Sequence, residues 1–151
     1  MIASTTITFP PRQPAVTLLL ARQRRKQPLI LLVEDDRMIA DMYSYQLERE
    51  GYQVEVATDG KRWLEAIRSR HPDLVLLDLR LPVMEGFEVL ESLATDATRP
   101  PVVILSNYGD SRMVSRGLAL GARDYLVKSA TTPTDLAEKV KAILPPGAPH
   151  L

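Results

Sequence analysis

From residue 29 onward, short apolar runs alternate five times with longer segments whose apolar positions recur at helical spacing. The apolar runs, rich in Val, Ile and Leu, predict strands at 29–34, 53–57, 74–78, 102–105 and 124–127. The other segments predict helices at 37–50, 60–70, 86–95, 111–120 and 133–144. Strict alternation of this kind is typical of a parallel sheet with helices on both faces. We therefore predict one doubly wound α/β domain over residues 29–144.

Residues at the predicted helix ends support these boundaries. Gly51 and Gly121 follow helices at positions where a left-handed backbone is favoured. Thr132 and Pro133 supply a capping hydroxyl and a first-turn proline before the last helix. We expect the apolar stripe of the first helix to face the core; its members are Ile39, Met42, Tyr43 and Leu47.

The composition excludes several classes of protein. No apolar run approaches the roughly 20 residues that cross a bilayer, so we expect no membrane span. The chain has no cysteine, which excludes disulfides and thiolate metal sites and fits a cytoplasmic location. Residues 1–28 hold five of the 19 basic residues and none of the 19 acidic ones, so residues 29–151 carry a formal charge of minus five. Because a body that binds nucleic acid is expected to be basic, we expect no direct DNA binding.

The two ends of the chain lack the pattern of the central region. Residues 1–28 contain four prolines and no sustained period, which predicts a flexible basic arm. The sequence leaves open whether this arm contacts an anionic membrane or an acidic partner, is merely disordered, or results from a start codon assigned too far upstream. Residues 145–151 are expected to form a short C-terminal tail, so we expect no effector domain after the α/β domain.

Polar side chains lie at or just beyond the ends of four of the five predicted strands. The first strand ends in Glu34, Asp35 and Asp36 and the third ends in Asp78, while Ser106 follows the fourth and Lys128 follows the fifth. Each one alone has an ordinary explanation as a helix cap, a turn residue or a solvated charge, and we interpret Asp36 as an N-cap. Together they lie at the carboxyl edge of the sheet, where folds of this class bind ligands. Their joint placement favours one shared site.

The carboxylates of this site indicate a metal ion and phosphoryl chemistry. Glu34, Asp35 and Asp78 would raise one another's pKa values unless a cation neutralised them. A histidine-free set of oxygen ligands suits Mg²⁺, or Mn²⁺ in its place. Beside such an ion, Asp78 can attack a phosphoryl group and form an aspartyl phosphate. Ser106 can donate a hydrogen bond to a phosphoryl oxygen, and Lys128 can supply a second positive charge.

With these residues in place, residues 29–144 resemble the receiver domain of two-component response regulators. The resemblance is carried, in the family's order and spacing, by Glu34-Asp35, Asp78 within "DLRLPVMEG", Ser106, Tyr125 and Lys128. It implies a flavodoxin-like (βα)5 fold with the strand order 2-1-3-4-5. It also implies a single-domain regulator similar to the chemotaxis response regulator.

The resemblance assigns the metal ligands and the phosphoryl donor. By it, Asp35 and Asp78 bind Mg²⁺ directly, Glu34 binds it through water, and the backbone carbonyl of Arg80 completes the protein ligands. A sensor histidine kinase or a histidine phosphotransfer protein would phosphorylate Asp78. The protein would therefore be a signalling phospho-acceptor and not an enzyme.

The resemblance also implies a conformational switch. Ser106 would move toward the phosphoryl group and Tyr125 would follow inward, while Lys128 assists the transfer. This movement would alter the surface of the fourth helix, fifth strand and fifth helix, which would bind a downstream output protein. Homodimerisation through the last two helices is left open.

Three further positions carry specific expectations. Ser129 stands where the family usually has proline, and because a cis bond before any other residue costs about 2.5–4 kcal/mol, we predict a trans Lys128–Ser129 bond. Arg80 and Tyr108, each two residues beyond a site residue, occupy positions that tune phosphate lifetime in this family. We expect both to shield the phosphoryl group and slow its hydrolysis.

Two other functions stay open. The first is an interaction module that keeps the receiver shape without phosphorylation, although the presence of Asp35, Asp78, Ser106 and Lys128 disfavours it. The second is a metal-dependent phosphatase with an aspartate nucleophile. The best-known fold of that class has a second aspartate two residues after the first, where this chain has Arg80.

Overall fold

The five predicted strands form one parallel sheet in the computed structural model, which describes residues 16, 26–79, 86–96 and 98–147. The strands are β1 (Leu29–Val33), β2 (Gln53–Ala57), β3 (Leu74–Leu77), β4 (Val102–Ser106) and β5 (Asp124–Val127). Their order across the sheet is β2-β1-β3-β4-β5, with every neighbouring pair parallel. The predicted order 2-1-3-4-5 is confirmed.

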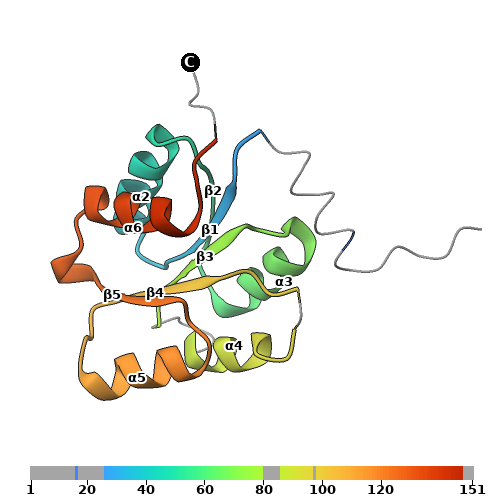
Figure 1. The fold of residues 1–151 in the computed structure, drawn as a ribbon, viewed down its shortest axis with the longest axis vertical. Helices are drawn as coiled ribbons and strands as arrows, with labels where there is room; N and C mark the ends of the chain where they lie inside the picture. Colours follow the sequence, from blue (N-terminus) through green and yellow to red (C-terminus); the bar gives the residue numbers. More distant parts are fainter. Residues whose placement is uncertain (1–15, 17–25, 80–85, 97, 148–151) are drawn as a thin grey trace, which may run out of the picture.

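Helices cover both faces of the sheet (Figure 1). On one face lie α2 (Arg37–Arg49) and α6 (Pro133–Ile143). On the other lie α3 (Gly60–Arg70), α4 (Gly86–Leu93) and α5 (Ser111–Ala119). Every predicted strand and helix is present, with ends within two residues of the prediction. A short 3-10 helix, η1 (Lys128–Ala130), follows β5 and was not predicted.

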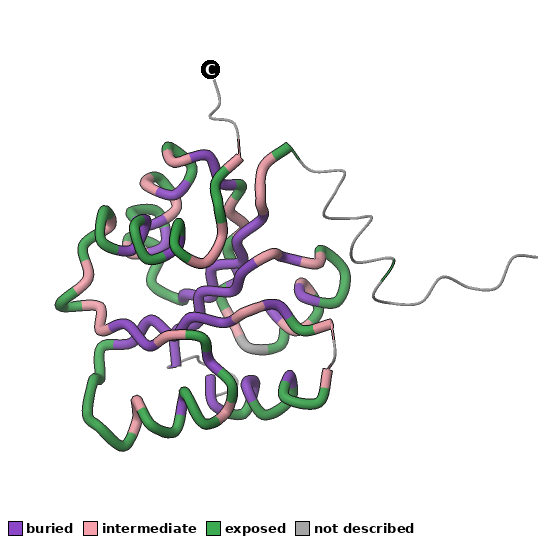
Figure 2. Tube along the Cα trace, viewed as in Figure 1, coloured by how far each residue is buried: buried purple, intermediate pink, exposed green. Residues whose placement is uncertain are grey.

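The central strands send alternate side chains into two separate cores. In β1, Ile30 and Leu32 contribute to the core under α2 and α6, whereas Leu31 and Val33 contribute to the core under α3, α4 and α5. Buried residues accordingly run along the middle of the sheet (Figure 2). Because both faces of a central strand are covered, its sequence is a continuous apolar run instead of an alternating one.

The apolar stripe of α2 faces the core only in part. Tyr43 and Leu47 are buried, and Ile39 is half-buried against the same core. Met42, however, is 44% exposed, so the prediction that it belongs to the core is wrong. The apolar residues of α2 extend around more of the helix than the sheet and α6 cover. Met38 and Tyr45 are also exposed, and with Met42 they form an apolar patch on the outer surface of α2.

Local signals at the helix ends act as predicted. Asp36 caps α2, its carboxylate accepting hydrogen bonds from two first-turn backbone amides at 3.0 and 3.2 Å. Thr132 and Asp135 form a reciprocal capping box at the start of α6. Gly51 and Gly121 have φ angles of 99° and 100°, a left-handed backbone that glycine adopts without a steric penalty. These caps set where helices begin and end around the sheet.

The ends of the described domain meet at the amino edge of the sheet, away from the carboxyl ends of the strands (Figure 1). The amide of Gly147 donates to the carbonyl of Gly51 at 3.3 Å, and Gly147 also lies against Lys26 and Gln27. Most of the predicted arm, residues 1–15 and 17–25, lies outside the described residues. Among the helices that are described, none combines the length and apolar character needed to cross a membrane.

Candidate functional site

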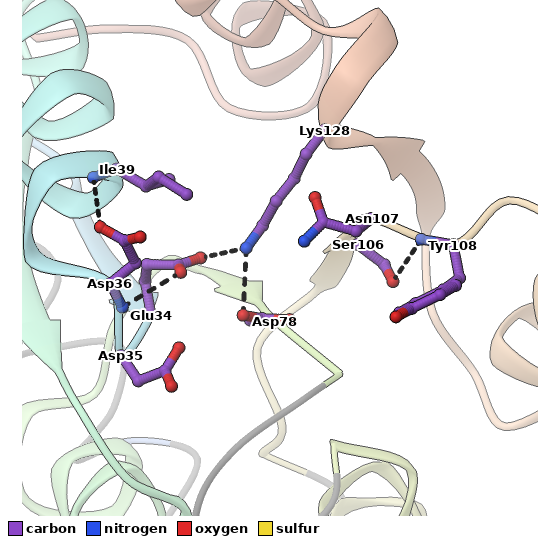
Figure 3. A pocket seen from close by; sticks show the side chains of 9 residues that line it. All are labelled: Glu34, Asp35, Asp36, Ile39, Asp78, Ser106, Asn107, Tyr108 and Lys128. Atoms are coloured by element: carbon purple, nitrogen blue, oxygen red, sulfur yellow. Dashed lines mark hydrogen bonds and ion pairs between the residues drawn. The ribbon is translucent and has the colours of Figure 1, made fainter.

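The carboxyl ends of four strands surround one pocket of about 240 Å³ (Figure 3). The pairing of Val33 with Leu77 brings the residues after β1 and β3 together, and the pairing of Ser106 with Val127 does the same for β4 and β5. Predicted site residues that line the pocket are Glu34, Asp35, Asp78, Ser106, Tyr108 and Lys128, and the capping residue Asp36 lines it as well. The sheet topology therefore joins residues from four separate parts of the chain.

Lys128 bridges two of the carboxylates. Its Nζ donates to Oε2 of Glu34 at 2.6 Å and to Oδ2 of Asp78 at 3.0 Å (Figure 3). All three side chains are less than a tenth exposed. Lys128 was predicted to balance charge in the pocket, but the sequence contained no signal that it contacts Glu34. Only the folded sheet brings these two side chains together.

Burial and the shared lysine shift the pKa values of groups in the pocket. Burial raises the pKa of Glu34 above its ordinary value and the charge of Asp78 raises it further, while the hydrogen bond from Lys128 offsets only part of this. Burial alone would lower the pKa of Lys128, but its hydrogen bonds and charge interactions with Glu34 and Asp78 outweigh burial and raise that pKa. One ammonium group is shared between two carboxylates, so the pocket retains excess negative charge.

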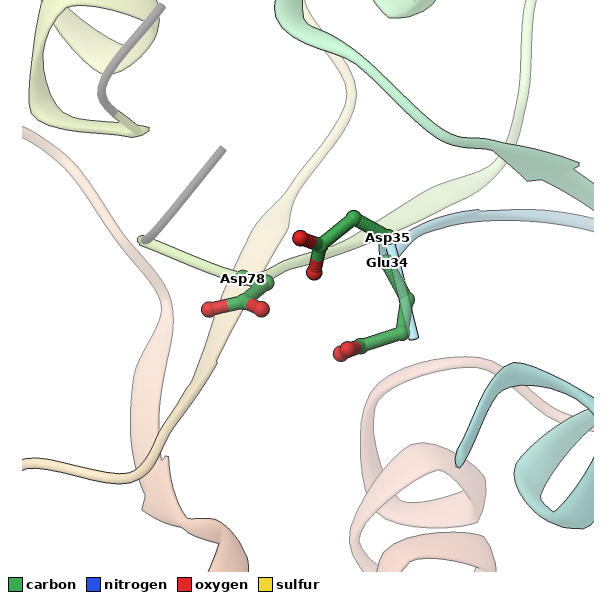
Figure 4. A group of neighbouring side chains, drawn as sticks. All are labelled: Glu34, Asp35 and Asp78. Carbon is green, nitrogen blue, oxygen red and sulfur yellow. The ribbon is translucent and has the colours of Figure 1, made fainter. Parts of the chain in front are cut away.

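The carboxylates of Glu34, Asp35 and Asp78 converge on one side of the pocket (Figure 4). Oxygen atoms of Glu34, Asp35 and Asp78 lie within 4.8 Å of one another, and Asp35 is exposed to solvent. A hard divalent cation such as Mg²⁺ prefers oxygen ligands and commonly binds through a few carboxylates and water. The donor set and the excess negative charge therefore fit such an ion.

A chain of hydrogen bonds connects Ser106 with Tyr125. Ser106 is buried, and its Oγ accepts a hydrogen bond from the amide of Tyr108 at 3.2 Å. The hydroxyl of Tyr125 donates to the carbonyl of Tyr108. Tyr125 itself is buried, whereas Tyr108 is 41% exposed at the pocket. The sequence predicted that Ser106 and Tyr125 act together, but not that the backbone of Tyr108 joins them.

Two sequence predictions concern the loops around the pocket. No described peptide bond is cis, so the Lys128–Ser129 bond is trans as predicted. The bond lies within η1, where the chain turns from β5 toward α6. Arg80, the predicted backbone ligand and lifetime residue, lies outside the described residues.

Comparison with known proteins identifies the family. Residues 30–141 match the model of the response regulator receiver domain. The chain belongs to this family. Within the described structure, the fold, the acidic pocket and the family match agree: the pocket of this receiver domain is consistent with Mg²⁺ binding and aspartate phosphorylation.

Individual relatives lead to the same family. The chain is 42% identical over 115 residues to the DNA-binding response regulator MtrA of Mycobacterium tuberculosis. The matched stretch covers 76% of this chain and 50% of MtrA. It is 37% identical over 115 residues to the alkaline phosphatase synthesis transcriptional regulatory protein PhoP of Bacillus subtilis, covering 76% and 48% of the two chains. This receiver domain thus spans about half the length of the curated relatives that it matches.

Solved structures agree with the sequence relatives. A crystal structure of a CheY-like receiver domain protein from Methanospirillum hungatei matches with a TM-score of 0.70 and 35% sequence identity. The match covers 76% of this chain and 91% of that one. The receiver fold of this chain therefore has a close experimental counterpart.

Proposed function

We propose that this receiver domain accepts a phosphoryl group on Asp78 in a two-component phosphorelay and thereby switches a partner-binding surface. The observation that carries the proposal is the position of Asp78. Its carboxylate lies at the end of β3 in a pocket, held by Lys128 at 3.0 Å and flanked by two further carboxylates. A carboxylate that was only structural would not need this surplus of negative charge beside it.

The transfer itself needs little from the protein beyond position and charge. A carboxylate oxygen of Asp78 would bond to phosphorus while the phosphorus–nitrogen bond of a phosphohistidine breaks, leaving the electron pair on the donor's imidazole. Lys128 would offset negative charge on the phosphoryl oxygens. The hydroxyl of Ser106, buried in the same pocket, would donate a hydrogen bond to one of them.

Glu34, Asp35 and Asp78 would hold Mg²⁺ or Mn²⁺ in this site. The resemblance to the family supports direct binding by Asp35 and Asp78, contact through water for Glu34, and the backbone carbonyl of Arg80 as a further ligand. When bound, the ion would neutralise charge on the phosphoryl group during transfer. The 4.8 Å cluster of carboxylate oxygens is the structural observation that supports this assignment.

The hydrogen bonds from Ser106 through Tyr108 to Tyr125 support a route for the switch. A shift of Ser106 toward a phosphoryl oxygen would pull on the Tyr108 backbone and so on the Tyr125 hydroxyl. Tyr125 lies in β5, so the response would reach the surface of α5, β5 and α6 and the output protein bound there. Tyr108 and Arg80 would also slow hydrolysis by covering the phosphoryl group.

The phosphoryl donor would be a sensor histidine kinase or a histidine phosphotransfer protein. Because Ile39 of α2 lines the pocket, a protein whose histidine enters the pocket would lie close to this helix. The same helix exposes the apolar patch of Met38, Met42 and Tyr45. Adjacent exposed apolar side chains are typical of interaction sites, so we assign this patch to contact with the donor protein.

The domain would act as a phospho-acceptor that promotes its own phosphorylation and dephosphorylation, and not as an enzyme with a separate substrate. MtrA is named as a DNA-binding regulator, but this chain matches only about half of it. The formal charge of minus five over residues 29–151 supports contact with proteins instead of DNA.

Mass spectrometry of the intact protein tests the proposed function. Incubation with acetyl phosphate and Mg²⁺ should add one phosphoryl group to the wild type and none to Asp78→Asn. Asp36→Asn is the matched control, because Asp36 lies in the same pocket and asparagine caps a helix equally well. Labelling of Asp78→Asn, or no labelling of the wild type, would refute the assignment of Asp78.

A further inference from the structure

The lysine that bridges Glu34 and Asp78 lies on a turn with little packing of its own. Lys128 begins the three-residue helix η1, and the next two residues, Ser129 and Ala130, are exposed. A 3-10 turn of this length has poor hydrogen-bond geometry and marginal stability. The sheet holds the start of the turn through the pairing of Val127 with Ser106, so contacts from elsewhere in the fold are needed mainly to hold the rest of it.

Tyr43 of α2 supplies such a contact. Its hydroxyl donates to the carbonyl of Thr131 at 3.2 Å, across 88 positions of sequence. Thr131, which follows the turn, donates two hydrogen bonds to its start: its amide donates to the carbonyl of Lys128 at 3.2 Å, and its hydroxyl donates to the carbonyl of Val127 at 2.8 Å. The phenol is thus bonded to the residue that joins the two ends of the lysine turn.

The ring of Tyr43 is itself firmly held. It is 2% exposed and packs in the core between α2, α6 and the sheet. Burial raises the pKa of the Tyr43 phenol, so the hydroxyl is protonated at neutral pH and acts as the donor. The hydrogen bond therefore connects the lysine turn with a side chain that has little freedom to move.

We propose that Tyr43 is a positioning residue for phosphoryl transfer: through Thr131 it holds the η1 turn so that Lys128 stays between Glu34 and Asp78. The inference rests on the proposed function only for the role of Lys128 in transfer. The geometry of Tyr43, Thr131 and Lys128 is independent of that role. Precision matters here, because a displacement of about 1 Å in a reacting group can cost on the order of 10²-fold in rate.

Tyr52 provides a matched control. It is 1% exposed in the same core, and its hydroxyl donates to the carbonyl of Leu144 at 2.5 Å. Leu144 follows α6, where the chain reaches the amino edge of the sheet, away from the pocket. Tyr43→Phe and Tyr52→Phe each remove one buried phenol hydroxyl from a backbone carbonyl, so both should lose comparable stability. Only Tyr43→Phe releases the lysine turn.

The first test is the rate of phosphorylation of the full chain over a range of acetyl phosphate concentrations with Mg²⁺. Tyr43→Phe should lower the maximal rate about tenfold without a matching change in the half-saturating concentration. Tyr52→Phe should leave both unchanged. In a Lys128→Ala background, Tyr43→Phe should cause no further loss, because it acts through that lysine. Equal rate losses in the two Phe variants, or no loss in Tyr43→Phe, would overturn the inference.

A second test does not require phosphorylation. Amide hydrogen exchange at Thr131 and the NMR signal of the Lys128 ammonium group report directly on the turn. Tyr43→Phe should accelerate the exchange and weaken the signal, whereas Tyr52→Phe should change neither. If wild type takes no phosphoryl group, the proposed function fails, but these measurements still decide whether Tyr43 positions Lys128. Unchanged exchange and signal in Tyr43→Phe would refute the positioning role by themselves.

Discussion

Lys128 and Glu34 lie 94 residues apart in the sequence, yet the Nζ of Lys128 is 2.6 Å from Oε2 of Glu34 and both side chains are buried. Lys128→Ala would leave Glu34 and Asp78 without their shared cation. Loss of a buried charged partner should lower the free energy of unfolding by about 3–5 kcal/mol in metal-free buffer at neutral pH. Urea denaturation measures this change.

The loss in Lys128→Ala should also depend on pH. The raised pKa of Glu34 would rise further without the lysine, so the deficit should grow as pH increases through that pKa and shrink in acid. Lys139→Ala, an exposed lysine on α6, is the control and should change stability little at either pH. A deficit that is equal in acid and at neutral pH would argue against an uncompensated carboxylate.

Asp35 is the exposed member of the carboxylate cluster, and its charge should cost stability when no cation is bound. Like charges at this separation repel by about 1 kcal/mol in water, so Asp35→Asn should stabilise the metal-free protein by that order at low ionic strength. Adding Mg²⁺ should stabilise the wild type and have little effect on Asp35→Asn. Thermal unfolding with and without Mg²⁺ tests both effects. Asp41→Asn, an exposed acid on α2, should respond to Mg²⁺ as the wild type does.

Gly117, buried on α5, leaves space for the Tyr125 ring. A Cβ atom at this position would lie 2.5 Å from Cδ1 of Ile104 and 3.2 Å from Cδ2 of Tyr125, and Ile104 is fully buried. Alanine normally favours a helix over glycine by about 1 kcal/mol, but overpacking costs about 1–3 kcal/mol. Gly117→Ala should therefore be destabilised in urea, whereas Ser115→Ala, exposed on the same helix, should not. A stabilised Gly117→Ala would show that Ile104 and Tyr125 can move aside.

Glu50 and Lys141 connect the end of α2 with α6 through a 2.6 Å ion pair. The hydrogen bond from Lys141 lowers the pKa of Glu50 below its ordinary value. A lowered folded-state pKa adds stability above the unfolded-state pKa, and this stability is lost as pH falls through the folded-state value. The wild type should therefore have a higher urea midpoint than Glu50→Gln at neutral pH, and the two midpoints should converge in acid. Because both side chains are partly exposed, high salt should reduce the difference at neutral pH.

Met38, 83% exposed on α2, should matter only when the phosphoryl donor is a protein. The donor for this test is a phosphorylated histidine phosphotransfer protein that labels the wild type. Met38→Asp should slow phosphoryl transfer from this donor about tenfold, as expected for an interface anchor. Labelling by acetyl phosphate should be unchanged, because this small donor needs no docking surface. Leu118→Asp, an exposed apolar position on α5, is the control and should behave as the wild type with both donors. Equal slowing with both donors would place the defect in the pocket instead.

Much of the fold could be predicted because its signals are local. Continuous apolar runs identified central strands such as β1, whose residues enter two cores in alternation. Asp36 and Thr132 marked helix starts, because a cap satisfies amides only two or three residues away. The ends of the strands also predicted which polar residues would meet, since parallel strands share one carboxyl edge.

Contacts between side chains were decided by the tertiary structure. The bond from Tyr43 to Thr131 and the ion pair of Lys128 with Glu34 join segments about 90 residues apart in the sequence. Likewise, Met42 has the spacing of a core residue but is exposed, because α6 and the sheet cover only part of α2. The strand ends indicated most of the polar groups that line the pocket. Which of them touch depends on how α2, η1 and α6 pack over the sheet, and no local pattern in the sequence encodes that packing.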